Sequence, residues 1–199
     1  MTLDEWPRRV AALAQFQVAD PTAPTLSGAD DRHLRRVLRA RPGEEIVVTD
    51  GRGRWSICAV SDAGLAAPTV VGADPAPPET ALYLSPVKGD RAEWALAKVT
   101  ELGIATVVPL LARRTARRFS GEARAKTLAR WRRVAGEAAG QCRRTYGLVV
   151  AEPVAVDDVP AGVCVADAGG SPAWSGVTAV AIGPGGGWAP WEWGAQDRR

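Results

Sequence analysis

The segment best suited to chemistry is the glycine-rich stretch Ile182-Gly183-Pro184-Gly185-Gly186-Gly187-Trp188. It follows a run of β-branched and small apolar residues, Val177–Ile182, which predicts a buried strand that ends where the glycines begin. Ligands of open α/β sheets bind at the carboxyl ends of the strands, and glycines there let main-chain N–H and C=O groups approach a ligand closely. An adenine or a methionyl group could be recognised in this way. A tight turn that binds no ligand is the alternative, and this heptapeptide leaves both open.

Two phosphate-binding loops are excluded by the residues around these glycines. No Lys-Ser or Lys-Thr pair follows them, as a Walker loop requires. The glycines also follow the last predicted strand and lack the GxGxxG spacing of a dinucleotide-binding turn.

The remaining reactive side chains give little support to hydrolytic or metal chemistry. His33, the only histidine, lies in a predicted helix of the smaller, N-terminal domain, a position that disfavours its use as the base of a Ser-His-Asp or Cys-His site. Cys58, Cys142 and Cys164 fit neither a zinc spacing nor a disulfide framework, so cysteine usage predicts a reducing, cytoplasmic location. No carboxylate cluster indicates a metal site. The sequence therefore favours group transfer from a bound donor, or simple binding.

Basic residues are concentrated in one part of the chain. The 199 residues carry 25 Lys and Arg against 22 Asp and Glu, a formal net charge of +3. From Arg113 to Arg144, eleven basic residues stand against two acidic ones, so this stretch carries +9 and the rest of the chain −6. Such asymmetry indicates a surface that faces RNA or DNA, with a solvated arginine-rich helix face as the alternative. No apolar run approaches the roughly 18 residues of a membrane helix.

A proline-rich stretch, Ala67–Glu79, divides the chain and predicts a linker, because prolines continue neither a helix nor a central strand. Before it, short segments of strand character predict a small β-barrel over residues 1–74. These segments are Phe16–Val18, Glu45–Thr49 and Arg54–Val60, with a hairpin turn at Asp50-Gly51-Arg52-Gly53 and one helix at Ala29–Leu38.

After the linker, residues 79–199 alternate strand and helix, which is typical of an α/β domain with a mainly parallel sheet. Predicted strands are Ala81–Leu84, Ile104–Leu111, Val163–Ala166 and Val177–Ile182. A helix begins near Asp90, where Glu93 completes a capping box, and ends at Gly103. A longer helix runs from Ser120 to about Arg144.

Each predicted helix carries an apolar row that faces a core and a polar row that faces water or a cleft. In the long helix the apolar row is Leu128, Trp131, Ala135, Ala138 and Cys142, and the polar row is Lys126, Arg130, Arg133, Glu137, Gln141 and Arg144. In the shorter helix the rows are Ala92, Ala95, Val99 and Leu102 against Arg91, Trp94, Lys98 and Glu101.

Motifs along nearly the whole chain resemble the ribosomal RNA small subunit methyltransferase E family, RNA methyltransferases of the SPOUT class. The first part resembles its PUA-like barrel in His33-Leu34-Arg35-Arg36-Val37-Leu38-Arg39, Pro42-Gly43-Glu44-Glu45 and Asp50-Gly51-Arg52-Gly53. The second part resembles its catalytic domain in Lys88-Gly89-Asp90-Arg91, Trp94, Lys98, Thr100-Glu101-Leu102-Gly103, Pro109-Leu110, Glu137-Ala138-Ala139, Gln141, Arg144 and Ile182-Gly183-Pro184 with Gly186-Gly187.

This resemblance implies an α/β fold in which an RNA-binding PUA-like β-barrel precedes a SPOUT-type α/β domain with a trefoil knot. It implies S-adenosyl-L-methionine as cofactor, a cytoplasmic homodimer, and methylation of uridine N3 in 16S rRNA of the small ribosomal subunit. A SPOUT enzyme with another RNA target is an alternative, since a fold does not fix a substrate.

The resemblance also implies roles for individual residues. Ile182, Gly183, Pro184, Gly185, Gly186, Gly187 and Trp188 would bind the cofactor, and Arg144 or Lys88 would stabilise the uracil anion. Basic side chains would hold RNA phosphates without reading bases. They are Arg32, Arg35, Arg36, Arg91, Arg113, Arg114, Arg117, Arg118, Lys126, Arg130 and Arg133.

The chain departs from the family pattern in two places. The family loop usually reads Gly-Pro-Glu-Gly-Gly, whereas here the third position is Gly185. Family members also continue with a further strand, a Leu-Gly-x-Arg-x-Leu-Arg-x-Glu-Thr-Ala loop and a final helix, which nothing in this sequence matches. We therefore expect an incomplete knot and a donor site that lacks one half. A catalytically inactive RNA-binding homologue is the alternative function.

Overall fold

The computed structural model describes residues 5–87, 91–113, 121–167, 169–170, 175–185, 187–189 and 193. The chain forms two compact units. The first contains Met1–Pro77 and Gly136–Gly147, and the second contains Pro78–Ala135 and Leu148–Arg199. No described helix is both long and apolar enough to cross a membrane.

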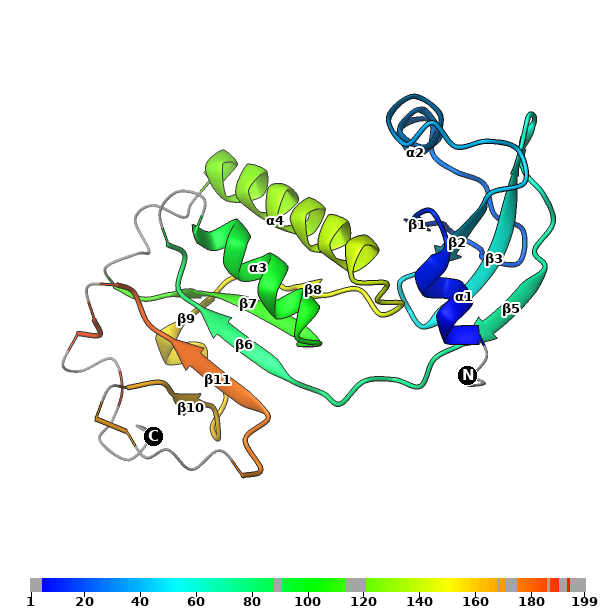
Figure 1. Cartoon of the computed structure of the whole chain (residues 1–199). Coiled ribbons are helices and arrows are strands. Elements are labelled where there is room, and N and C mark those ends of the chain that lie inside the picture. Colours follow the sequence, from blue (N-terminus) through cyan, green and yellow to red (C-terminus); the bar gives the residue numbers. More distant parts are fainter. Residues whose placement is uncertain are drawn as a thin grey trace. The chain divides into compact units, whose positions relative to one another are not determined.

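The first unit is built on a small mixed sheet (Figure 1). Helix α1 (Glu5–Ala11) precedes it, and its strands run in the order β1-β2-β3-β4, with β5 also paired to β3. The parallel β1–β2 pair is the exception among otherwise antiparallel pairs. The strands are β1 (Gln15–Gln17), β2 (Glu45–Thr49), β3 (Arg54–Ser61), β4 (Gly64–Leu65) and β5 (Val70–Ala73).

Strand β2 is apolar without alternation because both of its faces are covered. Ile46 and Val48 pack with Leu34 and Cys58 on one face, while Val47 packs with Trp55 on the other. All of these side chains are fully buried. The predicted hairpin is confirmed, since β2 pairs antiparallel with β3 around Gly51 and Gly53, which have φ of 72° and 97°. Positive φ is a conformation that glycine adopts without steric cost.

The predicted helix at Ala29–Leu38 is confirmed, although it changes type midway. It begins as α2 (Gly28–Arg32), where the Ser27 hydroxyl accepts a hydrogen bond from the Asp30 N–H at 3.1 Å, the usual helix N-cap. It continues as a π-helix, η1 (His33–Val37).

The predicted linker is wrong for Val70–Ala73, which form β5. The prolines lie on both sides of this segment, so its N–H groups are available to pair with β3. Gly72 lies opposite Trp55, and a Cβ at Gly72 would lie 2.4 Å from Cζ2 of the indole. The glycine therefore makes room for the largest buried side chain of this unit.

The second unit is a parallel sheet in the order β10-β11-β6-β7-β8, with β9 also paired to β7. In chain order it comprises β6 (Ala81–Leu84), α3 (Arg91–Glu101), β7 (Thr106–Leu111), α4 (Gly121–Gln141), β8 (Val149–Val150), β9 (Val154–Ala155), the short 3-10 helix η3 (Val156–Asp158), β10 (Cys164–Val165) and β11 (Ala179–Ile182). The α/β class is confirmed. The knot stays a prediction.

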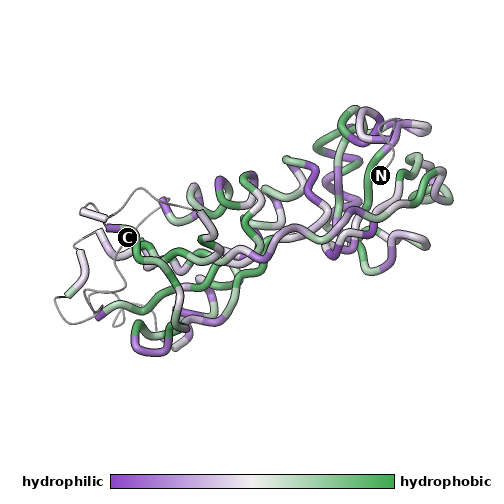
Figure 2. The backbone as a smooth tube through the Cα atoms, turned by 90° about the horizontal axis from the view of Figure 1, so that it is seen from below, coloured by the Kyte–Doolittle hydropathy of each residue, from purple (hydrophilic) through white to green (hydrophobic). Residues whose placement is uncertain are grey.

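Both faces of this sheet are covered. Helices α3 and α4 lie on one face (Figure 1), where Leu96, Leu128 and Trp131 pack with Val107 of β7. On the other face Leu110, also of β7, packs with Val165 and Ala181. Figure 2 shows hydrophobic residues concentrated along the strands, whereas the helices alternate hydrophobic and hydrophilic residues. The last turn of α4 belongs to the first unit.

Three sequence predictions need correction at helix ends. Helix α4 ends at Gln141 and not at Arg144, because the chain turns at Arg143 with φ of 59°. Cys142 is consequently only partly buried, although Leu128, Trp131, Ala135 and Ala138 are buried as predicted. Leu102 is 80% exposed, because α3 ends at Glu101 and the apolar row ends with it.

Candidate functional site

The glycine-rich loop leaves the sheet at the carboxyl end of β11, as predicted. Ile182 pairs in parallel with Leu84 of β6, and the Ser85 N–H donates to the Ile182 carbonyl at 3.0 Å. The buried Ser85 hydroxyl donates to the carbonyl of Leu110 at 3.2 Å. Ser85 therefore ties the ends of β6, β7 and β11 together directly below the loop. No sequence motif singles out Ser85, whose only signal is a small polar side chain directly after a strand.

The loop is a tight turn that exposes main chain. The Gly187 N–H donates to the Pro184 carbonyl at 2.8 Å, and Gly187 has φ of 74°. Pro184 is buried, while Gly185 is exposed and a Cβ there would meet no heavy atom within 4 Å. Gly186 lies outside the described residues. Ile182 is 42% exposed at the start of the turn. An apolar side chain beside open main-chain groups suits a flat heteroaromatic ligand recognised by its edges.

An aromatic pair supports the turn from the core side. The indoles of Trp188 and Trp193 are edge-to-face, with ring centroids 5.5 Å apart. Both pack against the core formed by Leu110, Val165 and Ala181. The turn is thus anchored at Pro184 and Trp188, and Gly185 projects between the anchors.

Of the two predicted catalytic residues, the structure describes Arg144. Lys88 lies outside the described residues. Arg144 belongs to the first unit and is partly buried, and its carbonyl accepts a hydrogen bond from the Gln15 amide at 2.8 Å. Burial lowers the pKa of its guanidinium below the ordinary value. A partly desolvated cation interacts more strongly with an anion than a fully hydrated one.

Three of the predicted phosphate-binding side chains are already in ion pairs. Arg35 donates to Asp31 at 2.9 Å and to the Ser61 carbonyl at 3.0 Å, Lys126 pairs with Glu122 at 2.7 Å, and Arg130 pairs with Glu93. Lys126 and Arg130 are nevertheless exposed, as are Arg32, Arg36, Arg91, Arg113 and Arg133. Arg114, Arg117 and Arg118 lie outside the described residues.

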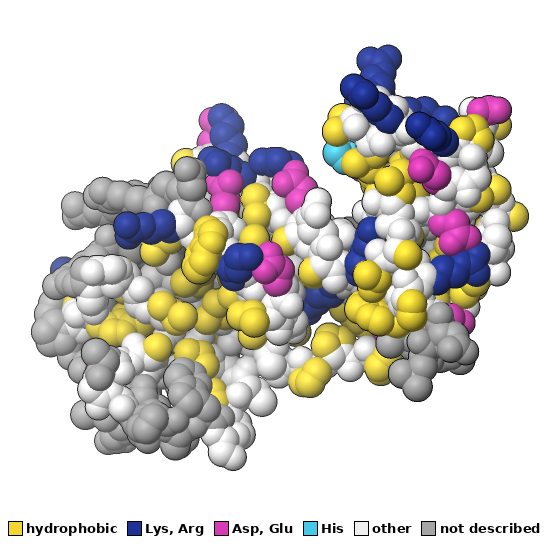
Figure 3. All heavy atoms as spheres, in the orientation of Figure 1, with side chains coloured by type: hydrophobic (Ala, Val, Ile, Leu, Met, Phe, Trp, Pro, Cys, Tyr) yellow, Lys and Arg dark blue, Asp and Glu magenta, His cyan; other side chains and the backbone are white. Residues whose placement is uncertain are grey.

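Basic side chains gather at the end of the first unit that carries α2 and η1 (Figure 3). Arg32 and Arg36, exposed on α2 and η1, together with Arg39 and Arg41 just after them, form what we call the helical basic surface. His33 also lies here and packs edge-on against Phe16, with ring centroids 6.2 Å apart. This contact gives the histidine a packing role.

Two arginines on α4 share an acidic partner, Glu152, that the sequence pattern does not indicate. Glu152 accepts from Arg124 at 2.5 Å and from Arg132 at 3.0 Å. The guanidinium groups of Arg124 and Arg132 lower the pKa of the Glu152 carboxyl. Part of the positive charge of this helix is therefore neutralised within the unit. Among the described residues no group of His, Cys, Asp and Glu side chains could hold a metal ion.

Comparisons with known proteins agree with this architecture. Residues 74–197 match the model of an RNA methyltransferase domain, and residues 26–66 match that of an RNA methyltransferase PUA domain. These matches place the chain in the class of RNA methyltransferase domains that are preceded by a PUA domain. The chain belongs to the ribosomal RNA small subunit methyltransferase E family.

The curated relatives are distant and longer. The chain is 34% identical over 130 residues to ribosomal RNA small subunit methyltransferase E of Mycobacterium bovis. The matched region covers 60% of this chain and 47% of that protein. For the Synechocystis enzyme of the same name the identity is 32% over 146 residues, with coverages of 71% and 46%. The chain therefore spans about half the length of the curated relatives it matches.

Two solved structures share the fold. Ribosomal RNA small subunit methyltransferase E of Neisseria gonorrhoeae, solved with bound S-adenosyl methionine, superposes with a TM-score of 0.73 at 24% identity, covering 90% of this chain and 82% of that one. A Legionella pneumophila protein in complex with the cofactor SAM superposes with a TM-score of 0.76 at 23% identity, covering 89% and 82%.

Proposed function

We propose that this chain transfers a methyl group from S-adenosyl-L-methionine to N3 of a uridine in 16S rRNA of the small ribosomal subunit. The observation that carries the proposal is the exposed glycine turn at the edge where β6, β7 and β11 end, in a chain of this family. Ligands of parallel α/β sheets bind at that edge. We further propose that the enzyme acts in the cytoplasm as a homodimer.

The donor would be held by Ile182, Gly183, Pro184, Gly185, Gly186, Gly187 and Trp188. When bound, S-adenosyl-L-methionine supplies an electrophilic methyl group. The exposed Ile182 side chain offers an apolar contact for an adenine ring, and the main-chain groups around Gly185 offer hydrogen bonds to its edge. Ser85 keeps the strand ends in register, so that these groups are preorganised.

Methylation at N3 requires the uracil ring to lose its N3 proton, so the enzyme must favour the anion. A cation near the ring does this by electrostatic stabilisation. We assign that role to Arg144 or Lys88. The partial burial of Arg144 supports it, because a desolvated guanidinium stabilises an anion more strongly than an exposed one.

RNA phosphates would be held by the basic side chains of both units. The helical basic surface supplies Arg32 and Arg36, with Arg35 beside them, and α3 and α4 supply Arg91, Lys126, Arg130 and Arg133. Arg113, Arg114, Arg117 and Arg118 extend this set. Such contacts provide affinity that falls with salt and carries little sequence information.

A second candidate is an RNA-binding homologue that does not catalyse methyl transfer. Two observations favour it. Gly185 provides no carboxylate at the tip of the turn, and the Trp188 indole occupies the space directly over Gly183. Both candidates bind RNA, so donor binding separates them.

The first experiment is calorimetric titration of the folded chain with S-adenosyl-L-methionine. Stoichiometric binding, followed by transfer of labelled methyl to small ribosomal subunits, supports the methyltransferase. A folded chain that releases no heat on titration, yet binds RNA, supports the second candidate. Arg144→Ala is then expected to depress turnover far more than donor affinity, with Arg144→Lys recovering part of the turnover. Equal losses in both quantities contradict a role for Arg144 in stabilising the anion.

A further inference from the structure

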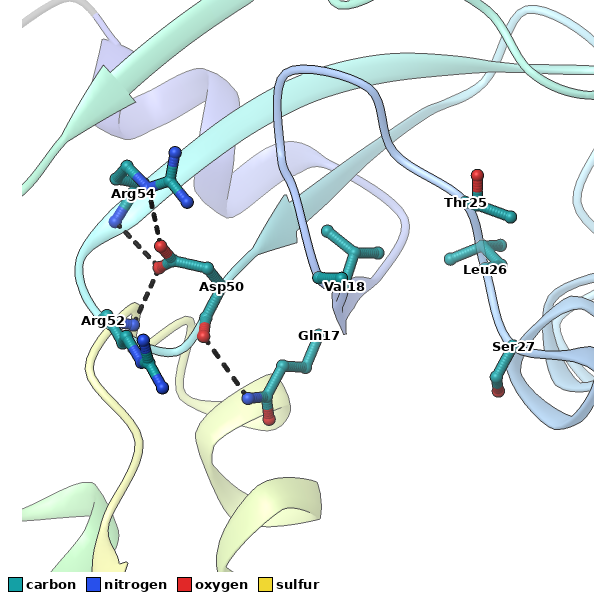
Figure 4. A pocket seen from close by; sticks show the side chains of 9 residues that line it. Gln17, Val18, Thr25, Leu26, Ser27, Asp50, Arg52 and Arg54 are labelled. Atoms are coloured by element: carbon teal, nitrogen blue, oxygen red, sulfur yellow. Dashed lines mark hydrogen bonds and ion pairs between the residues drawn. The ribbon is translucent and has the colours of Figure 1, made fainter.

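The first unit contains a pocket outside the helical basic surface (Figure 4). It lies between the end of β1, the segment that leads into α2, and the β2–β3 hairpin. Polar side chains from all three segments line it. The lining residues are Gln17, Val18, Ala19, Thr25, Leu26, Ser27, Asp50, Arg52 and Arg54.

The hairpin wall of this pocket is rigid because Asp50 fixes it. The Asp50 side chain is 7% exposed and accepts hydrogen bonds from the N–H groups of Arg52 at 2.8 Å and Arg54 at 3.1 Å. It also accepts from Nε of Arg54 at 2.7 Å. Three hydrogen bonds to one carboxylate thus fix the turn, so the pocket is formed before any ligand arrives.

The opposite wall is joined to the hairpin by Gln17. Its amide nitrogen donates to the Asp50 carbonyl at 3.4 Å, and a Cβ at Gly51 would lie 2.7 Å from that nitrogen. Gly51 therefore permits the amide to lie against the hairpin. Figure 4 shows the Gln17 side chain directed toward Asp50, with Thr25, Leu26 and Ser27 on the segment across the pocket. The amide group presents both a donor and an acceptor to the pocket.

The two arginines of the pocket differ in what they already bind. Arg54 is held by Asp50 and lies 3.9 Å from Asp20. Arg52 is exposed, its main-chain N–H is fixed by Asp50, and in the described part of the chain its guanidinium makes no ion pair. A cation on a rigid turn, in one pocket with the Gln17 amide, suits an anion attached to a group with hydrogen-bonding edges.

We propose that this pocket binds one unpaired nucleotide of the RNA substrate, with its phosphate on Arg52 and its base edge on the Gln17 amide. Leu26, partly buried, supplies an apolar contact for the ribose or base. A nucleotide in a duplex has its base stacked and paired, whereas a single-stranded nucleotide can turn its base into a pocket. The inference rests on the proposed function only in taking RNA as the substrate, and it names a site apart from the phosphate-binding arginines of α2 and η1.

The test uses the full chain and a fluorescein-labelled, ten-nucleotide single-stranded RNA, followed by fluorescence anisotropy. Arg52→Gln is expected to weaken binding by roughly tenfold, the size of one good charge-assisted contact. Gln17→Ala is expected to weaken it about fivefold or more. Arg124→Gln removes an arginine that lies outside both the pocket and the helical basic surface and is paired with Glu152, and it is expected to change affinity less than Arg52→Gln. Thermal unfolding of each variant checks that the fold is retained.

A second measurement locates the nucleotide directly. In amide proton–nitrogen spectra of the labelled chain, uridine 5′-monophosphate is expected to shift the Gln17 side-chain amide and the main-chain amides of Gly51 and Arg52. Shifts confined to α2 and η1, or an Arg52→Gln variant that binds like Arg124→Gln, contradict the pocket and leave RNA binding by the helical basic surface intact. A wild-type chain that binds no RNA contradicts both nucleotide binding by the pocket and the proposed function.

Discussion

The indole of Trp188 lies directly over the backbone of Gly183. A Cβ at Gly183 would lie 2.5 Å from Cε2 of that indole, closer than side chains approach one another in folded proteins. The first glycine of the turn is therefore required by packing, whatever the turn binds. Gly185, two residues further on, faces open space. This difference gives a matched pair of substitutions within one loop.

Gly183→Ala is expected to destabilise the second unit and to weaken donor binding. The added methyl group must displace Trp188 and, through it, Trp193, and overpacking of this kind costs about 1–3 kcal/mol. Gly185→Ala is the control and should leave the free energy of unfolding nearly unchanged. Urea unfolding followed by tryptophan fluorescence measures both. Equal stabilities of the two variants would show that Trp188 moves aside without cost.

Asp74→Asn is expected to destabilise the first unit strongly. The Arg9 side chain is 1% exposed and bonds to Asp74 at 2.9 and 3.0 Å, and its guanidinium lies 4.4 Å from the Trp55 ring. Asp74 also accepts from Trp55 at 3.1 Å and from Thr145 at 2.6 Å.

Removing one partner of a buried ion pair costs about 3–5 kcal/mol, because the other charge stays buried. Asp62→Asn, in the exposed turn between β3 and β4, is the control for a general effect of lost charge. Urea unfolding at neutral pH compares the two. A loss no greater than that of Asp62→Asn would mean that Arg9 reaches solvent when Asp74 is neutral.

The stability of the hairpin is expected to depend on the ionisation of Asp50. Burial alone raises the pKa of Asp50, but the hydrogen bonds from Arg52 and Arg54 outweigh it and bring the pKa below its ordinary value of 3.8. A carboxyl whose pKa is lower in the folded state stabilises the fold above pH 3.8, and this contribution is lost as the pH falls through the folded-state pKa.

Asp50→Asn should therefore lower the free energy of unfolding at pH 7 by about 1.5–3 kcal/mol, the range for hydrogen bonds to a charged group. The difference from wild type should shrink as the pH falls below 3.8, because the protonated acid resembles the amide. Urea unfolding across this range measures it. A difference that is constant with pH would mean that the shape of the Asp50 side chain, and not its charge, stabilises the hairpin.

The double variant Arg32→Gln/Arg36→Gln is expected to reduce RNA affinity without changing sequence preference. Each phosphate contact that is lost should reduce the slope of log affinity against log salt concentration by roughly one. Arg124→Gln is the control, because Glu152 already neutralises this arginine. Filter binding at several salt concentrations gives the slopes. An unchanged slope for the double variant would show that Arg32 and Arg36 of the helical basic surface do not contact RNA phosphates.

The sequence by itself determined the local elements and the family. Strand β2 and strand β6 have the predicted bounds, because a short apolar run between turn residues is a local signal. The hairpin at Asp50-Gly51-Arg52-Gly53 follows from the demand of its turn for positive φ. The apolar row of α4 follows from helical periodicity, and it failed only where the helix ends.

Only the tertiary structure decided which distant elements meet. Strand β11 lies beside β6, which comes far earlier in the sequence. The glycine turn after β11 therefore lies at the sheet edge where β6 ends, and Ser85 joins both strands to β7. Arg9 is buried against a residue 65 positions away. Sequence periodicity shows which face of a helix or strand is apolar. Which element that face contacts depends on side-chain packing and on the hydrogen bonds that buried polar groups form in the folded chain. That is why the turn was predictable, but the contacts of Ser85, Asp74 and Gln17 were not.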